Sequence, residues 1–481
     1  MLHEQLKKNI IKSISARYSQ YAIQLLLLMV YSRFFSPEDF GSIGLITVMV
    51  NFFMVFGEAG ISSALVTKRD VTYKERCDIF GFTFILAISM SLLIYASLYL
   101  MNIIYTRDDY QYIGIYSTVS VFFFVVTSVP LAGLISDKKF LIIARNNIAS
   151  EIITLCIVLF LYKKIENIYL LGIRFALQAI FYFMFTYTSC KNSMLGQPIP
   201  TLNFSSVNKI KGFSLYLLGF NFINYLSRNF DNFLVGKFMG ETYLGLYNRT
   251  YSLMRYPLQL ITFAVSPAIQ PVLTERKYER VAVKRVHQSI ANKVLLLSSI
   301  IAILIYINSN IIVSVILGNQ WEKVGDLLSI MSLAIPLMLI TSFNGGFWQA
   351  FDETKSQFKV GIFTLFIMMS SMAIGIYISN DLEQFSYAVV IGLNITNVNA
   401  FCQLFKKLYY CSYQKCLLKI IKHLALFYLI VLSYNFLNNI LMFTFIQQVL
   451  FSVFSVITIF IYFKFINHAK EKRHISHNTT L

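Results

Sequence analysis

The chain has 481 residues, of which 57% are hydrophobic and only 13% charged, and its mean hydropathy is +0.63. A water-soluble domain usually carries about 25% charged residues, so this composition excludes a soluble globular protein and indicates a membrane protein. The net charge of +18 would suggest a nucleic-acid partner for a soluble protein. Here the basic residues lie between apolar runs, and we expect no nucleic acid.

The cysteines give no sign of a metal or a disulfide framework. There are 6 of them, and none forms a Cys-x-x-Cys pair. We therefore expect neither a metal site nor a cofactor. The first apolar run is not followed by a small-residue cleavage site, so we also expect no cleavable signal peptide.

Apolar runs long enough to cross a membrane recur along the whole chain. A span needs roughly 20 mostly apolar residues to cross about 30 Å of hydrocarbon. We predict about fourteen spans, of which the first, seventh and eighth contain enough polar residues to score weakly by hydropathy. They lie near residues 15–34, 41–66, 79–101, 111–135, 147–162, 168–189, 212–236, 243–268, 293–317, 326–350, 360–379, 385–405, 417–435 and 444–466.

The basic residues support this arrangement independently. Most of the 41 Lys and Arg residues fall in alternate loops, such as 67–78 and 269–292. The positive-inside rule then places both termini on the cytoplasmic side of the membrane. All loops are short, so we expect no soluble catalytic domain and no catalytic residues.

Two landmarks recur in the second half of the chain. The stretch Phe35-Ser-Pro-Glu-Asp-Phe-Gly41 is echoed by Phe238-Met-Gly-Glu-Thr-Tyr-Leu-Gly245, and Val129-Pro130-Leu131 by Ile335-Pro336-Leu337, at nearly the same offset. Such repeats are typical of transporters that handle substrate between two halves. We predict an all-α membrane fold of two pseudo-symmetric six-helix bundles followed by two extra helices, with boundaries at 1–205, 206–410 and 411–481.

Several of these stretches resemble a known family. Residues 33–44 (RFFSPEDFGSIG), 221–236 (NFINYLSRNFDNFLVG), 243–257 (YLGLYNRTYSLMRYP) and 267–271 (PAIQP) are similar to motifs of Wzx-type polysaccharide flippases. These belong to the multidrug/oligosaccharidyl-lipid/polysaccharide exporter (MOP) superfamily, and the resemblance is closest to its O-antigen, capsule and exopolysaccharide branch. The resemblance implies alternating access by a V-shaped pair of bundles. It also implies an undecaprenyl-pyrophosphate-linked oligosaccharide as the substrate, with polysaccharide polymerase or export machinery as an expected partner.

The seventh predicted span carries a continuous polar stripe. Ionisable residues within spans cost roughly 2.5–3.5 kcal/mol each on insertion scales, so each invites a functional hypothesis. Residues at steps of three and four share one helix face, and a polar face must contact a partner helix or water. The stripe consists of Asn221, Asn224, Arg228, Asp231 and Asn232, with Tyr225 beside it.

Four arginines within spans are candidate ligands for an anionic diphosphate, because the guanidinium donates two hydrogen bonds to phosphate oxygens and stays charged. Arg255, near mid-span, is the strongest candidate. Arg228 is an alternative that Asp231 could neutralise, and Arg249 and Arg174 could instead extend towards the interface. Asn248 adds polar lining beside Arg249. Asp231 is predicted to be the one well-buried carboxylate.

Prolines within spans are candidate hinges, because each removes a backbone hydrogen bond and can bend the helix. They are Pro130, Pro257, Pro267 and Pro336. Packing alone can also require such bends.

Other functions compete with the flippase hypothesis. A drug or cation antiporter of the same superfamily would need buried carboxylates, whereas this chain has an excess of cations in its spans. A lipid II flippase would need the same cationic cavity. A membrane polymerase or ligase is disfavoured by the short loops, and a ligand-free scaffold does not explain the polar seventh span.

Overall fold

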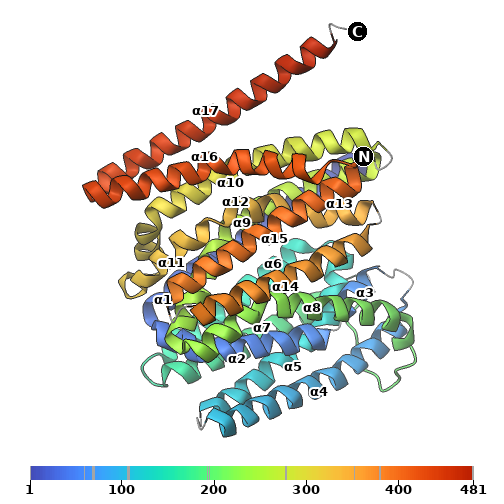
Figure 1. Cartoon of the computed structure of the whole chain (residues 1–481). Helices are drawn as coiled ribbons and strands as arrows, with labels where there is room; N and C mark the ends of the chain where they lie inside the picture. The colour runs from blue at the N-terminus through green and yellow to red at the C-terminus, as the bar shows by residue number, and fades with distance from the viewer. Residues whose placement is uncertain are drawn as a thin grey trace. The chain divides into compact units, whose positions relative to one another are not determined.

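The structure is a computed structural model of the whole chain (Figure 1). It describes all residues except 1, 59, 68–70, 106–108, 192, 194–195, 277–278, 352, 379–380 and 479–481. Regular structure in the described part is helical, apart from one isolated bridge between Tyr162 and Ile165. The predicted all-α class is therefore confirmed, and the chain is a multi-pass membrane protein.

The chain divides into two compact units, Met1–Gly245 and Leu246–Leu481. In the first unit, the largely buried α5 packs between α4 and α7, and α8 packs against α2, α3 and α4. Its helices are α1 (Leu2–Phe34), α2 (Pro37–Glu58), α3 (Ile61–Thr67), α4 (Tyr73–Tyr105), α5 (Asp109–Ser136), α6 (Phe140–Leu161), α7 (Asn167–Cys190) and α8 (Val207–Phe238).

The second unit begins within α9 (Glu241–Arg276). Here α10 contacts α11, α12, α16 and α17, while α15 packs on α14. The other elements are α10 (Arg280–Ile316), the short 3-10 helix η1 (Asn319–Trp321), α11 (Glu322–Ser332), α12 (Ile335–Thr341), α13 (Asn344–Ala350), α14 (Thr354–Ile378), α15 (Leu382–Tyr409), α16 (Tyr413–Leu441) and α17 (Phe445–Asn478).

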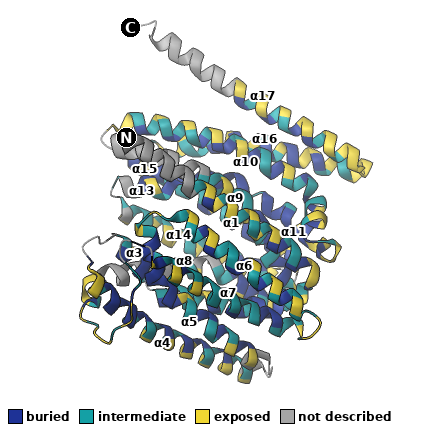
Figure 2. Ribbon diagram, turned by 180° about the vertical axis from the view of Figure 1, so that it is seen from behind, coloured by how far each residue is buried: buried dark blue, intermediate teal, exposed yellow. Residues whose placement is uncertain are grey.

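The outward faces of the helices are apolar, as a lipid-facing surface requires. Figure 2 shows exposed residues gathered along α4, α16 and α17. Among them, Leu92 of α4 is 63% exposed and Phe460 of α17 is 56% exposed. Exposed apolar side chains of this size and number suit contact with hydrocarbon rather than with water.

Ten helices of the described chain are long and apolar enough to cross a membrane, or up to eleven if one bent pair counts as a span. That pair, Asn319–Ser332 with Ile335–Trp348, bends by 57° within the predicted span 326–350. The predicted spans 15–34, 212–236 and 243–268 are also helical, as α1, α8 and α9. Polar residues lower the mean hydropathy of these three helices, so length and composition alone do not identify them as spans. The predicted number of about fourteen spans therefore stays a prediction.

The division at Gly245 falls later than the predicted boundary at 205, because α8 packs with the helices of the first unit. The boundaries 1–205, 206–410 and 411–481 describe a sequence duplication rather than contacts, and they remain predictions.

The two repeated turns lie against each other in the first unit. Ser36 begins α2 with a reciprocal cap, since its hydroxyl accepts the Asp39 N–H (3.1 Å) and its own N–H donates to the Asp39 carboxylate (2.8 Å). Gly41 then contacts the backbone of Glu241, where an added Cβ would overlap the carbonyl. Gly245, the repeat counterpart of Gly41, approaches the Pro37 carbonyl just as closely.

We expect Gly41→Val to weaken this packing, because the new side chain would be forced into the Glu241 backbone. Overpacking of this kind costs about 1–3 kcal/mol. Thermal unfolding of the purified protein should show a lower midpoint than wild type. The control is Gly361→Val in α14, where an added Cβ meets nothing within 4 Å; equal midpoints for the two variants would contradict the contact.

Candidate functional site

The polar stripe of α8 is described in part. The side chains of Asn221, Asn224 and Arg228 lie outside the described residues. Asp231 and Asn232 are 2% and 8% exposed, so this end of the stripe is buried in protein rather than facing lipid. The Asn232 side-chain oxygen is buried without a hydrogen-bond partner in the described chain, which leaves one acceptor of the stripe unused.

Tyr225 fixes the same helix against α2. Its hydroxyl donates to the carbonyl of Val48, and its ring centroid lies 5.8 Å from that of Phe52. Phe222 joins these rings, 6.2 Å from Phe52 and 5.4 Å from Phe56. The predicted lining residue Tyr225 is therefore anchored by its hydroxyl and presents an aromatic surface to α2.

Arg174 of α7 lies in a polar cluster within the first unit. Its guanidinium is 4.1 Å from the centroid of the Tyr31 ring and 4.0 Å from the Glu151 carboxylate on α6. Gln178 donates to the other Glu151 oxygen at 2.5 Å. The charge of Arg174 is thus balanced by a neighbouring helix.

The prediction of a single well-buried carboxylate is wrong. Glu151 is 5% exposed and Asp78 of α4 is 2% exposed. Asp78 accepts the hydroxyls of Thr201 (2.8 Å) and Ser206 (2.7 Å). Both carboxylates have protein partners far away in sequence, which is why neither could be recognised from the span pattern.

The other two candidate arginines lie on α9 in the second unit. The Arg249 guanidinium is 5.8 Å from the ring centroid of the buried Trp321. Arg255 is exposed, and its guanidinium lies 5.5 Å from the ring of Tyr251, one turn earlier on the same helix. No carboxylate of the described residues lies within 4.0 Å of Arg255. Asn248 is half-buried, and its backbone carbonyl accepts the Ser252 hydroxyl at 2.8 Å.

The four candidate hinge prolines differ in their settings. Pro130 lies inside α5, and Pro257 inside α9. The side chain of Pro267, also in α9, is outside the described residues. Pro336 sits in the first turn of α12, at the break where the helix pair bends by 57°. A hinge role for these prolines remains a prediction.

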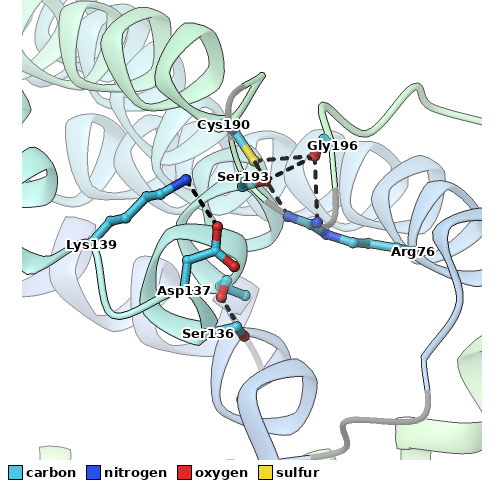
Figure 3. A network of polar contacts seen from close by, with 8 residues as sticks. Arg76, Ser136, Asp137, Lys139, Cys190, Ser193 and Gly196 are labelled. Carbon is cyan, nitrogen blue, oxygen red and sulfur yellow. Dashed lines mark hydrogen bonds and ion pairs between the residues drawn. The ribbon is translucent and has the colours of Figure 1, made fainter. Parts of the chain in front are cut away.

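A buried arginine that the sequence analysis counted among loop cations holds the segment leading to α8. Arg76 of α4 is 1% exposed. Figure 3 shows its guanidinium reaching the Gly196 carbonyl (3.4 Å) and the Cys190 sulfur (3.4 Å). It also donates to the Val129 carbonyl (3.3 Å), next to Pro130. Gly133 makes room for it, since a Cβ there would overlap the guanidinium.

We expect Arg76→Met to destabilise the first unit, because buried carbonyls lose their donors. An unsatisfied buried group costs roughly 1–3 kcal/mol. The midpoint of thermal unfolding of the purified protein should fall clearly. Lys74→Met removes an exposed cation from the same turn and should leave the midpoint unchanged; a similar fall in both variants would contradict the structural role.

Comparison with known proteins identifies the family. Residues 30–326 match the family of polysaccharide biosynthesis proteins, which is more than half of the chain. The chain belongs to this family. It is 25% identical over 321 residues to the amylovoran biosynthesis protein AmsL of Erwinia amylovora, covering 65% of this chain and 80% of AmsL. It is 24% identical over 133 residues to the teichuronic acid biosynthesis protein TuaB of Bacillus subtilis (strain 168), covering 28% of each.

Solved structures show the same fold. The lipid II flippase MurJ in an inward closed conformation matches with a TM-score of 0.72 at 17% identity, covering 95% of this chain and 99% of MurJ. An inward-facing multidrug resistance MATE transporter of the MOP superfamily matches with a TM-score of 0.67 at 13% identity, covering 84% and 99%. The polysaccharide biosynthesis family and the MOP fold confirm the predicted resemblance.

Proposed function

We propose that the chain is a flippase that moves undecaprenyl-pyrophosphate-linked oligosaccharide units from the cytoplasmic to the periplasmic leaflet of a bacterial inner membrane. The product would serve O-antigen, capsule or exopolysaccharide synthesis. The observation that carries this proposal is the combination of a polysaccharide biosynthesis family with a fold shared with a lipid flippase. The chain would act as a carrier that alternates access between leaflets and neither makes nor breaks a covalent bond.

The charges within the spans support an anionic headgroup as cargo. Arg174 is balanced by Glu151 and so contributes less than the sequence predicts. Arg255, exposed on α9 without a nearby carboxylate among the described residues, has its guanidinium donors available. A diphosphate accepts two parallel hydrogen bonds from such a group. We assign Arg255 the central role, with Arg228 and Arg249 as further phosphate ligands.

Polar and aromatic side chains along the same helices suit the sugar portion. Asn221, Asn224, Asn232 and Asn248 would donate to and accept from hydroxyls, and Asp231 would accept from them. Tyr225 would add ring surface. Pro130, Pro257, Pro267 and Pro336 would let the helices bend as access alternates.

Two alternative functions, cation antiport and lipid II transport, make different chemical demands on the protein. A cation antiporter would use free buried carboxylates, but the buried carboxylates of Glu151, Asp78 and Asp231 all accept from or pair with protein groups. A lipid II flippase would share the diphosphate and lipid tail. The family of polysaccharide biosynthesis proteins favours a polysaccharide repeat unit over the peptidoglycan precursor, and a polysaccharide polymerase as the next protein to receive the product.

We expect deletion of the gene to make undecaprenyl-linked single repeat units accumulate on the cytoplasmic side, because synthesis continues while translocation stops. Lipid extraction with protection from an external glycosidase would measure this, and plasmid-borne wild type should restore surface polysaccharide. A changed drug sensitivity with normal surface polysaccharide would instead establish the antiporter.

Replacing Arg228, Arg249 and Arg255 together with Ala should leave the protein inserted but abolish surface polysaccharide. Each charge-assisted hydrogen bond is worth roughly 1.5–3 kcal/mol, so we expect at least about a hundredfold loss of transport. The matched control removes three exposed cations from predicted inner loops, Arg145, Lys406 and Lys407, also to Ala. Wild-type polysaccharide in the first triple variant would overturn the assignment of these arginines.

A further inference from the structure

The second unit contains a polar pocket that the proposed phosphate ligands do not use. Its volume is about 240 Å³, and it lies between α10, α11, α16 and α17. Apart from Ile307 and Ile311, every lining residue carries a polar side-chain group. In Figure 1 the turn between α16 and α17 lies at the same end of the unit as α11 and the end of α10. A concave pocket with several polar groups is a candidate binding site for a polar ligand.

A break in α10 shapes one wall of this pocket. Asn308 has non-helical backbone angles (φ −109°, ψ 17°). Its amide donates to the Leu304 carbonyl (2.9 Å) and to the Ser452 hydroxyl of α17 (3.0 Å). The break immediately precedes Ser309 and Asn310, which line the pocket. Gly325 of α11 lies against the Asn310 amide, where an added Cβ would overlap it.

Two asparagines of α16 present donors to the pocket. The Asn435 side-chain oxygen accepts the Tyr306 hydroxyl (2.9 Å), and the Asn438 side-chain oxygen accepts the Phe443 N–H (3.1 Å). Because each amide oxygen is engaged, the groups left for a ligand are the amide N–H donors. The two amide nitrogens can therefore donate to the oxygen atoms of a polar ligand.

One free carboxylate complements these donors. Asp326 of α11 is exposed, and its carboxylate makes no hydrogen bond or ion pair within the described chain. No Lys or Arg is among the lining residues, so a phosphate here would meet repulsion without compensation. Tyr306 and Tyr434, with ring centroids 6.1 Å apart, add aromatic surface. The ligand that fits is uncharged or amino-bearing, and both donates and accepts hydrogen bonds.

We propose that this pocket binds one sugar residue of the transported oligosaccharide, a neutral or amino sugar, on the predicted outer side of the second unit. The proposal rests on the proposed function and deepens it. Hydroxyls of a pyranose donate to Asp326 and accept from Asn435 and Asn438, and the volume far exceeds that of a single-water cavity. The two extra helices, α16 and α17, thereby complete a sugar site rather than serving only as additional spans.

The test compares two lipids that differ only in the sugar. The full-length protein is purified in nanodiscs and titrated with undecaprenyl-linked repeat units extracted from the deletion strain, and separately with undecaprenyl pyrophosphate. The pocket variant combines Asp326→Asn with Asn310→Leu, neither of which removes a hydrogen bond made by these side chains in the described chain. The control is Asn439→Leu, an exposed neighbour of Asn438 on α16 that does not line the pocket.

We expect the pocket variant to bind the sugar-bearing lipid about tenfold more weakly than wild type, the effect of roughly 1.4 kcal/mol, and to bind undecaprenyl pyrophosphate as wild type does. Asn439→Leu should match wild type for both lipids. Equal binding of the sugar-bearing lipid by wild type and pocket variant overturns the sugar site while leaving the flippase intact. An equal loss for both lipids also overturns it, because the pocket is then only structural. Binding of neither lipid by wild type overturns the proposed function itself.

Discussion

Hydrocarbon offers no hydrogen-bond partner, so every polar group within a span must be satisfied by protein, by water or by cargo. This constraint sorts the charged residues of the chain. Arg76 gives its donors to the Gly196 and Val129 carbonyls, and Arg174 faces Glu151; both belong to the architecture. Arg255 has no such carboxylate in the described chain and is exposed. Because Arg255 is predicted to lie near mid-span, the proposed function assigns it to the anionic cargo.

Much of the architecture was predictable from the sequence, because the hydropathy of the spans and the distribution of basic residues among the loops are two independent signals. Hydropathy alone misses α1, α8 and α9, whose polar residues lower the average. The alternation of basic loops still places a helix at each of these positions, since an omitted span would reverse the sidedness of all later loops. The repeated Glu-Gly turns were recognisable too. Their contact through Gly41 and Gly245 was not, because similarity between two segments does not show whether they lie close together in the fold.

The features that the sequence did not predict depend on contacts between residues that are distant along the chain. Lys74 and Arg76 look alike in a charge count, yet one is exposed and the other 1% exposed. Glu151 and Arg174 sit on different helices, so no spacing pairs them. The break at Asn308 involves neither proline nor glycine and is tied to Ser452 of α17. The side chains of Asn221, Asn224 and Arg228 lie outside the described residues, and their role as cargo ligands stays a prediction.

A lipid-linked oligosaccharide joins two chemically opposed parts, and one set of ligands cannot serve both. A diphosphate needs cations and is repelled by carboxylates, whereas sugar hydroxyls are bound by carboxylates, which accept hydrogen bonds, and by amides, which both accept and donate. In the second unit, cationic and carboxylate or amide side chains lie on separate elements. Arg249 and Arg255 are on α9, whereas Asp326, Asn435 and Asn438 line the pocket of α10, α11 and α16. In the proposed function, the arginines of α9 would recognise the anionic linker that all carrier lipids of this class share. The proposed sugar pocket would discriminate among repeat units separately, so affinity for the carrier lipid and selectivity for the sugar could vary independently.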